Sequence, residues 1–422
     1  MKNKHIIAFF ALLLTLCLTA CSGGDVQNNM DTNMNSNISD FVSKSLPATD
    51  QSASFADNLI LLTADDGNRM LSPYSAKMCL ALLANGAEGE TRQQILDAIG
   101  IEDLDVYNAD VKALLARYAS YEKVMTLSTA NSLWLNQTTL GGKGAFIESY
   151  RDAMQDCFSA EIREVTDKNS IEEVNAWVNE KTNGKIDQIL TEDHRSFAAA
   201  LLNAVYFKAA WEFPFSENLT EQGNFTNADG SISETEFMHD TGTYGYYQAD
   251  GIQAVKLNYN HYADEYTYFG DGYDFSMYLI LSEDMPQIEA LLNTVEFKSE
   301  KVCLTIPKFE MHYSVSMNEI LRKLGITDAF DRDKADLGAM VDLTATANNL
   351  FVDEVLQKTY IKIDENGTEA AAVTEILVAP TSAAIEIPRP IKEFTADKPF
   401  YFVVRDNTSG ELLFVGRYET VK

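Results

Sequence analysis

The chain has 422 residues, enough for one large domain or two to three ordinary ones, and its hydrophobic fraction of 46% is that of a globular protein. Its 63 acidic residues outnumber its 33 basic residues, which gives a formal charge of -30 and a pI near 4.4. Such a surface repels phosphates, and the sequence has no dense lysine or arginine cluster, so we expect no nucleic-acid partner and no heparin site.

The first twenty residues have the pattern of a secretory signal peptide. Lys2 and Lys4 precede a run of mostly apolar residues, 6–20, which is shorter than the roughly 20 residues that span a bilayer. The sequence Leu18-Thr19-Ala20-Cys21 resembles a bacterial lipobox, which implies cleavage before Cys21 and lipidation of that cysteine. An ordinary signal peptide with an incidental cysteine is the alternative.

The mature chain is expected to have two parts. Residues 21–48 are rich in Asn, Ser, Asp and Gly and are typical of a flexible tether that follows the lipidated cysteine. Residues 49–422 contain no second linker and no repeat, so we expect one domain and a monomer. Only Cys79, Cys157 and Cys303 remain there, an odd number that argues against a disulfide framework.

Helical signals dominate the first half of this domain. Ser72-Pro73 begins a helix as N-cap and first-turn proline, and Asn85-Gly86 ends it. A second helix begins at Gly89, and the apolar positions of residues 171–190 predict one or two more.

Strand signals dominate the second half, so the predicted class is α+β. The strand-like runs are Leu201 to Lys208, Ala254 to Leu257, Phe275 to Leu281, Val302 to Ile306, Leu350 to Val355, Tyr360 to Ile363, Phe400 to Val404 and Leu412 to Gly416.

The stretch GTEAAAVTEILVAPT, residues 367–381, alternates like a half-buried strand although its alanines favour a helix. One face is small and free of charge, whereas both glutamates lie on the other face. The first face carries Thr368, Ala370, Ala372, Thr374, Ile376 and Val378, and the second carries Glu369, Ala371, Val373, Glu375 and Leu377.

The sequence gives no support for an enzyme. It lacks the H-E-x-x-H, C-x-x-C, G-x-S-x-G, P-loop and G-x-G-x-x-G patterns, and Asp364-Glu-Asn-Gly367 fails the EF-hand spacing. We expect no catalytic residue, no metal and no cofactor. The Tyr- and Asp-rich residues 250–274 are interpreted as an exposed insertion between strands, with a metal or sugar site, as in a glycan-binding surface lipoprotein, as the alternative.

The octet GTEAAAVT, preceded by Ile363-Asp-Glu-Asn, resembles the hinge of the reactive-centre loop of serpins, the family of suicide protease inhibitors. Further motifs are similar to the family and occur in the family's order from about Phe55 to the C-terminus. They are Asn68 to Ser75, Gly86 to Thr91, Ala130 to Trp134, Asn175 to Val178 with Thr182 to Ile186, Leu202 to Lys208 with Trp211, Ile306 to Phe309, Leu324 to Phe330, Lys398 to Phe400 and Leu413 to Gly416.

The resemblance implies a serpin fold with a helical N-terminal half, three β-sheets with a large central sheet, and an exposed loop at about residues 365–393. It also implies a metastable inhibitor. A protease attacks the loop, forms an acyl-enzyme and is trapped when the cut loop inserts into the central sheet. The absence of glutamate from the small face favours an inhibitor over the non-inhibitory members of the family.

Other roles are carried over from the family by position. The resemblance places the shutter cluster, Ser72, Ser75, Asn203 and Gln357, beneath the strands that separate, and Trp211 where the loop enters, with Lys308 pairing Glu365. The family commonly has histidine at Gln357, ahead of the basic residue matched by Lys358. Ordinary hydrogen bonding in the core is the alternative for this cluster. The hinge residues are Glu365, Gly367, Thr368, Glu369, Ala370, Ala371, Ala372 and Thr374.

The bond that a protease would cut has two estimates. The family's spacing from Glu365 gives Thr381-Ser382, and the spacing back from Lys398-Pro-Phe400 gives a bond near Pro388-Arg389. The first is favoured, because extra length before the bond would slacken the tether. Val378, Ala379, Ala383 and Ala384 are alternatives.

The expected target is therefore an elastase-like or subtilisin-like serine protease, with papain-like cysteine proteases as a further option. We expect the protein to cross the inner membrane and to be lipid-anchored in the cell envelope, at the outer membrane or cell surface. The rival interpretation is a non-inhibitory serpin-fold surface lipoprotein whose loop is only a substrate.

Overall fold

The computed structural model describes residues 53–63, 67–142, 144–262, 274–344, 346, 348–369 and 390–421. Most of its longer helices precede residue 182, as the sequence predicts. The α-helices are α1 (Phe55–Leu62), α2 (Pro73–Gly86), α3 (Gly89–Ile99), α4 (Leu104–Ser120), α5 (Glu148–Phe158), α6 (Ser170–Lys181), α7 (Ile288–Thr294) and α8 (Asn318–Lys323).

Strands fill most of the remaining chain. They are β1 (Arg69–Leu71), β2 (Met125–Asn136), β3 (Glu161–Val165), β4 (Ala199–Ala210), β5 (Glu221–Thr226), β6 (Ile232–Ala249), β7 (Ile252–Asn258), β8 (Phe275–Leu281), β9 (Lys298–Pro307), β10 (Phe309–Ser316), β11 (Val352–Asp364), β12 (Gly367–Thr368), β13 (Lys392–Thr395), β14 (Phe400–Asp406) and β15 (Leu412–Tyr418).

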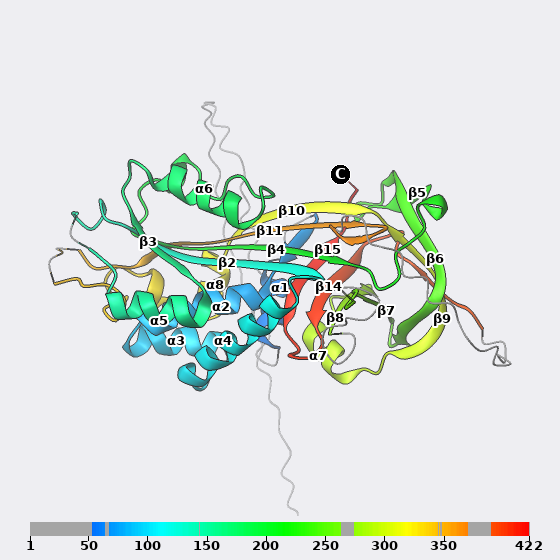
Figure 1. The fold of residues 1–422 in the computed structure, drawn as a ribbon, viewed down its shortest axis with the longest axis horizontal. Coiled ribbons are helices and arrows are strands. Elements are labelled where there is room, and N and C mark those ends of the chain that lie inside the picture. The colour runs from blue at the N-terminus through cyan, green and yellow to red at the C-terminus, as the bar shows by residue number, and fades with distance from the viewer. Residues whose placement is uncertain are drawn as a thin grey trace, which may run out of the picture. The chain divides into compact units, whose positions relative to one another are not determined.

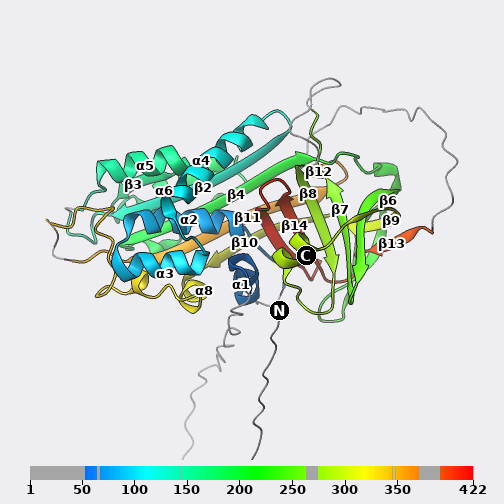
Figure 2. The same cartoon turned by 90° about the horizontal axis from the view of Figure 1, so that it is seen from below.

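The predicted α+β class is confirmed, and the strands form two hydrogen-bonded sheets among the described residues. The six-stranded sheet has the order β10-β11-β12-β4-β2-β3. The nine-stranded sheet has the order β1-β15-β14-β8-β7-β6-β9-β13, with β5 paired to β6. The third expected sheet is not separate, because the long strand β6 pairs β9 along residues 237–246 and β7 along its last five residues. Figure 2 shows β7, β6 and β9 side by side.

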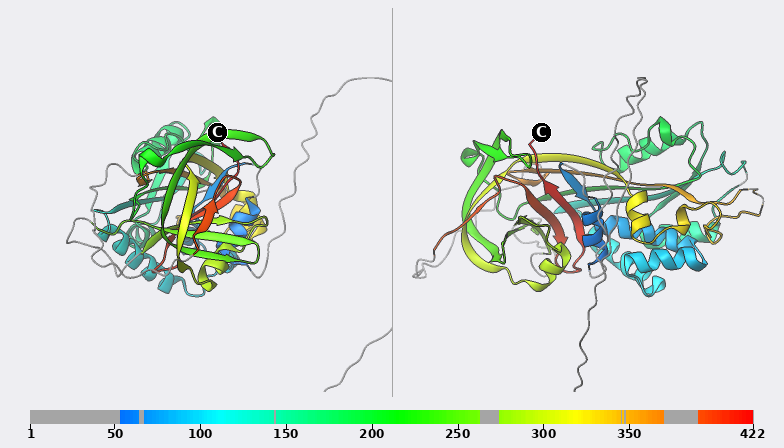
Figure 3. Two further views of the ribbon diagram at one scale, coloured as in Figure 1. Left: turned by 90° about the vertical axis from the view of Figure 1, so that its right-hand side faces the viewer. Right: turned by 180° about the vertical axis from the view of Figure 1, so that it is seen from behind.

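Helices cover both faces of the six-stranded sheet. In Figure 1, α6 lies on one face and α2 to α5 lie on the other. Trp177 of α6 meets Trp134 of β2 edge to face, with ring centroids 5.8 Å apart, so α6 is fixed to the sheet by aromatic packing. Figure 3 shows the same domain from behind, where yellow β10 forms an edge of this sheet.

Helix α2 begins where the sequence predicts. Ser72 accepts a hydrogen bond from the backbone N–H of Ser75 at 3.3 Å, and Pro73 occupies the first helical position. The residues predicted as a further helix after α6 are not helical. Ile186, Ile189 and Leu190 instead pack into a buried cluster beside α6.

Two predicted strands, Leu350 to Val355 and Tyr360 to Ile363, are one strand in the structure. The polar residues Gln357 and Thr359 look like a break between them in the sequence. Both side chains are buried, and they donate to Asn203 of β4 and to the carbonyl of Met70 in β1, so the strand continues through them.

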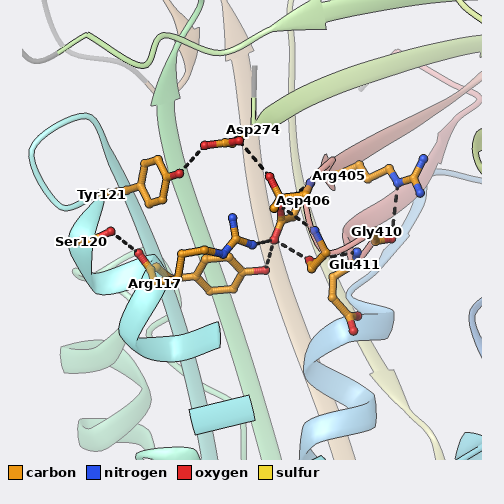
Figure 4. Close-up of polar contacts among 11 residues, drawn as sticks. Arg117, Ser120, Tyr121, Asp274, Arg405, Asp406, Gly410 and Glu411 are labelled. Carbon is orange, nitrogen blue, oxygen red and sulfur yellow. Dashed lines mark hydrogen bonds and ion pairs between the residues drawn. The ribbon is translucent and has the colours of Figure 1, made fainter. Parts of the chain in front are cut away.

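A polar network ties the end of α4 to the hairpin of β14 and β15 (Figure 4). Asp406 is fully buried, forms an ion pair with Arg117 and accepts hydrogen bonds from Tyr118 at 2.9 Å and from Ser409 at 2.5 Å. Because this carboxylate is paired and hydrogen-bonded, the network fixes α4 against the nine-stranded sheet. Of the helices described, none combines the length and apolar character that a membrane crossing requires.

Candidate functional site

The central feature of the site is a seam between two parallel strands of the six-stranded sheet. Strand β11 pairs directly with β4 from Val352 opposite Ala199 to Tyr360 opposite Tyr206. Beyond that point the two strands separate, and the two-residue strand β12 lies between them, antiparallel to both. The sheet is therefore already open by one strand at one end and closed along the rest.

Gly367 can occupy this position because it has no side chain. A Cβ atom there would lie 2.2 Å from the carbonyl oxygen of Ala209 and 2.7 Å from the Cα of Ala210. Any other residue would push β12 away from β4.

Thr368 points into the protein interior. It is fully buried, and its hydroxyl lies 2.6 Å from the hydroxyl of Tyr259. The ring of Tyr259 stacks on that of Trp211 with centroids 4.9 Å apart. A small polar residue fits this place, whereas a long charged side chain would be buried without a partner.

Trp211 lies where the sequence places it, at the entry to the seam. Its indole Nε1 donates to the carbonyl of Asp364 at 3.0 Å, and its backbone N–H donates to the carbonyl of Asn366 at 2.9 Å. The backbone N–H of Phe215 donates to the carbonyl of Glu365 at 2.8 Å. The turn between β11 and β12 is therefore held by three hydrogen bonds from the segment that follows β4.

The predicted pairing of Lys308 and Glu365 is present. Lys308 Nζ lies 3.2 Å from Glu365 Oε1 and 3.5 Å from Glu236 Oε2, and Thr220 donates to Glu365 at 2.7 Å. Desolvation opposes the charge on Glu365, yet the hydrogen bonds from Thr220 and Lys308 lower the pKa of that carboxyl below 4.5. Desolvation also opposes the charge on Lys308, but its interactions with Glu365 raise the pKa of the lysine.

The four residues of the shutter cluster are brought together beneath the seam. Gln357 accepts from the Ser72 N–H at 2.8 Å and donates to the Ser72 carbonyl at 3.1 Å and to Asn203 Oδ1 at 2.8 Å. Asn203 in turn donates to the hydroxyl of Ser75. All four are buried, so the amide of Gln357 joins α2 to both strands of the seam.

Glu369 follows β12 and points to the opposite face of the sheet, which the connection after α6 covers. Its carboxylate forms an ion pair with Lys185, which lies in the connection after α6. In the described part of the hinge, Thr368 and Glu369 thus lie on opposite faces, as the alternation predicts.

Several predicted positions lie outside the described residues. They are Cys21, the hinge residues Ala370, Ala371, Ala372 and Thr374, the bond candidates Val378, Ala379, Thr381, Ser382, Ala383 and Ala384, and the part of the Tyr- and Asp-rich segment at 263–273.

Sequence reasoning missed four residues of the site. Asn131 lies inside a recognised motif and accepts from Asn203 at 2.5 Å, and Lys185 lies inside another. Tyr259 and Thr220 lie outside every recognised motif, and each contributes one hydroxyl to the hinge. Only the motif positions of Asn131 and Lys185 could have pointed to them.

Comparison with known proteins places this architecture in one family. The family model described as "Serpin (serine protease inhibitor)" matches residues 50–421. Serpin-Z10 of Arabidopsis thaliana is 32% identical over 380 residues, which cover 85% of this chain and 93% of the plant protein. Human Serpin B9 is 27% identical over 390 residues, which cover 87% and 98% of the two chains.

Solved structures give the same result. The thermophilic serpin tengpin in its native state has a TM-score of 0.74 and 29% identity, covering 89% of this chain and 96% of its own. The native stressed conformation of Arabidopsis AtSerpin1 has a TM-score of 0.72 and 27% identity, covering 87% and 95%. Serpins are generally protease inhibitors and not enzymes. With its family model, its relatives and its fold in agreement, the chain belongs to the serpin family.

Proposed function

We propose that this protein is a suicide inhibitor of serine endopeptidases that traps its target by inserting the cleaved loop between β4 and β11. The observation that carries the proposal is β12, a two-residue strand already seated between these two strands with Thr368 fully buried. A chain that continues from Thr368 along the seam would complete a strand, and the new strand would add backbone hydrogen bonds to both neighbours.

In the proposed reaction, the serine of the protease forms an ester with the carbonyl carbon of the residue before the cut, and the amine of the next residue leaves. Insertion of the freed loop then carries the ester-bound protease along the sheet. Distortion of its active site prevents hydrolysis of the ester, so the protease stays covalently bound. The conformational free energy released by insertion drives this distortion.

The register of β12 supports Thr381-Ser382 as the bond. Thr368 lies opposite Ala209, and β4 begins at Ala199. Extending this register residue by residue brings Val378 opposite Ala199, so β4 can pair with residues up to Val378. Thr381 follows three residues later, whereas Pro388 follows ten residues later and would leave slack between the sheet and the protease.

The residues before Thr381-Ser382 indicate the class of target. They are small or β-branched, and Arg389, which is followed by Pro390, is the only basic residue between Glu365 and Lys392. An elastase-like or subtilisin-like protease fits this loop better than a trypsin-like one. Papain-like cysteine proteases form a comparable thioester and are a further target class.

The sequence of the N-terminus supports a location in the envelope of a bacterium. Residues 1–20 would direct secretion, and lipid on Cys21 would anchor the protein through residues 21–48 at the outer membrane or cell surface. There the inhibitor would protect envelope proteins from proteases of a host or of neighbouring microbes. Mass spectrometry of the purified protein would detect diacylglyceryl-modified Cys21, and an unmodified chain starting elsewhere would contradict the anchor.

The test of inhibition is a gel. The protein without residues 1–21 is incubated with pancreatic elastase and, separately, with subtilisin, then boiled in detergent. We expect a covalent complex that resists boiling, and peptide mapping of the released fragment should give the cut at Thr381-Ser382. A cut loop with free, active protease for every enzyme tried would favour the non-inhibitory alternative.

Thr368→Arg provides the matched variant for this experiment. Arginine would place a charge in the buried site beside Tyr259, so the loop would insert slowly and the ester would be hydrolysed first. We expect cleaved loop and active protease from a variant that still folds. Thr368→Ser, which keeps the hydroxyl, should retain the complex.

A further inference from the structure

Glu369 stands at the fork where β12 ends and the seam closes. Its backbone N–H donates to the carbonyl of Lys362 at 2.9 Å, but its φ of 46° lies in the left-handed region, which residues other than glycine rarely adopt. The pair Tyr360 and Tyr206 closes the sheet directly ahead of it. The chain therefore leaves the sheet at Glu369 with a strained backbone.

The side chain of Glu369 is also held. Its carboxylate, only 15% exposed, forms an ion pair with Lys185, and its Oε2 has no hydrogen-bond partner among the described residues. The ammonium of Lys185 also lies 5.2 Å from the ring centroid of Tyr360. One lysine thus contacts both the first outward residue of the loop and the residue of β11 that closes the seam.

Lys185 is positioned by an ordered segment. The connection of residues 181–190, which we call the α6 strap, is held by Asn175, whose side chain bonds to Ile189 and Leu190 at distances of 2.8 and 2.9 Å. Thr182 accepts from the Ile186 N–H at 3.0 Å. The strap is therefore a fixed turn and not a free tether for Lys185.

The α6 strap also joins the two sides of the seam. On one side, Ser128 of β2 donates to the carbonyl of Lys181 at 2.7 Å. On the other side, Lys358 of β11 donates to the carbonyl of Gln188. A strand that enters between β4 and β11 moves these two sides apart, so it strains the strap and separates Lys185 from one of its two partners.

We propose that Lys185 and Glu369 form a latch that holds the loop at two inserted residues and sets the rate at which the rest of the loop enters the sheet. This inference rests on the proposed insertion mechanism and adds its control step. Lys185 is a positioning residue, because it acts on the loop through Glu369. Full insertion requires Glu369 to adopt an extended φ and to release Lys185.

The experiment measures uptake of a synthetic peptide with the sequence of residues 370–378, AAAVTEILV, by the intact protein. This peptide competes for the closed part of the seam and needs no protease. Uptake at a fixed excess of peptide is followed by native gel and by the intrinsic fluorescence of the three tryptophans, of which Trp211 contacts the hinge turn. The proteins compared are the wild type, Lys185→Met, Glu369→Gln and the charge swap Lys185→Glu with Glu369→Lys.

We expect either single substitution to accelerate uptake by about fivefold, the usual effect of one partly exposed ion pair. The charge swap should return the rate to within about twofold of the wild type, because it restores the pair. Lys168→Met is the matched control, since this exposed lysine lies outside the α6 strap, has no ion pair among the described residues and should leave the rate unchanged. In the single variants, faster insertion should also lower the amount of inhibitor consumed per protease trapped.

Three outcomes would overturn the latch. They are an unchanged rate of uptake in both single variants, an additive acceleration in the charge swap, and no uptake of peptide by any of the proteins. The two proposals fail separately. If uptake depends on Lys185 and Glu369 as expected but no protease forms a covalent complex, the latch stands and the proposed inhibitory function is wrong. If the protein inhibits proteases but takes up the peptide at a rate that does not depend on Lys185, only the latch proposal is wrong.

Discussion

The two sheets of this serpin are held together by different kinds of contact. In the nine-stranded sheet, β14 lies between β15 and β8, and its Phe400 and Phe402 are fully buried among other aromatic rings. In the six-stranded sheet, the seam between β4 and β11 is backed by the amides of Gln357 and Asn203. Aromatic packing fixes one partner arrangement, whereas amides and hydroxyls can exchange partners as strands move apart. The comparison indicates that the fold keeps its immobile and its movable parts in different sheets.

Loop cleavage should produce the largest effect, because it lets the six-stranded sheet gain the loop as a further strand while leaving the other sheet unchanged. We expect the midpoint of thermal unfolding, measured by circular dichroism, to rise by on the order of 10 °C or more after the loop is cut. The Thr368→Arg variant, cut at the same bond, should rise much less. Equal midpoints for cut and intact wild type would show that the seam stores no energy.

Phe402→Ala tests the other sheet. Removing this ring, whose centroid lies 5.3 Å from that of Phe309 in β10 of the six-stranded sheet, should destabilise the protein by about 3–5 kcal/mol through the cavity left behind. Because β14 does not move in the proposed reaction, urea unfolding should show the same loss in intact and cleaved protein. A loss confined to one form would mean that loop insertion changes the packing of Phe402 against Phe309.

Gln357→Met tests the shutter cluster. The substitution leaves the backbone N–H of Ser72 and the Oδ1 atom of Asn203 without their partner, at a cost of about 1–3 kcal/mol in unfolding free energy. Gln357→His is the matched control, since an imidazole still donates and accepts, and it should lose less stability than the methionine variant. Equal losses would assign the effect to shape and not to hydrogen bonding.

Acidification tests the anchor of the hinge turn and should give the smallest effect. The pKa of Glu365 is lowered in the folded state, so its contribution is present above its unfolded value of 4.5 and is lost as the pH falls through the folded pKa. At neutral pH, Glu365→Gln should be less stable than the wild type by about 1 kcal/mol. The difference between the two proteins should vanish in acid, and a difference that does not change with pH would exclude the carboxylate as its source.

Much of the site followed from the sequence because its residues sit in motifs with strong local signals. The glycine, the small residues and the N-cap of α2 are constraints that act within a few neighbours, and Gly367, Thr368 and Ser72 lie as expected. Trp211 and the pair of Lys308 with Glu365 needed the family resemblance, because their partners lie far away in the sequence.

What the sequence did not predict depends on tertiary contacts. The interruption expected in β11 is absent because Gln357 and Thr359 find buried partners on α2 and β1, which no periodicity reports. The position of Lys185 over the fork depends on the turn of the α6 strap, and the fusion of two sheets depends on the path of β6. Such contacts join segments that the chain separates widely.

The far end of the reactive loop enters the other sheet, where β13 pairs with β9 and β14 lies among the central strands. Cleavage at Thr381-Ser382 would therefore give two fragments that stay associated. The short C-terminal fragment supplies β13, β14 and β15 to the nine-stranded sheet, and the larger fragment has no strands to replace them. Size-exclusion chromatography would still give one peak, and the small fragment would come away only in denaturant. Cleavage of the loop would therefore break the backbone without separating the two fragments.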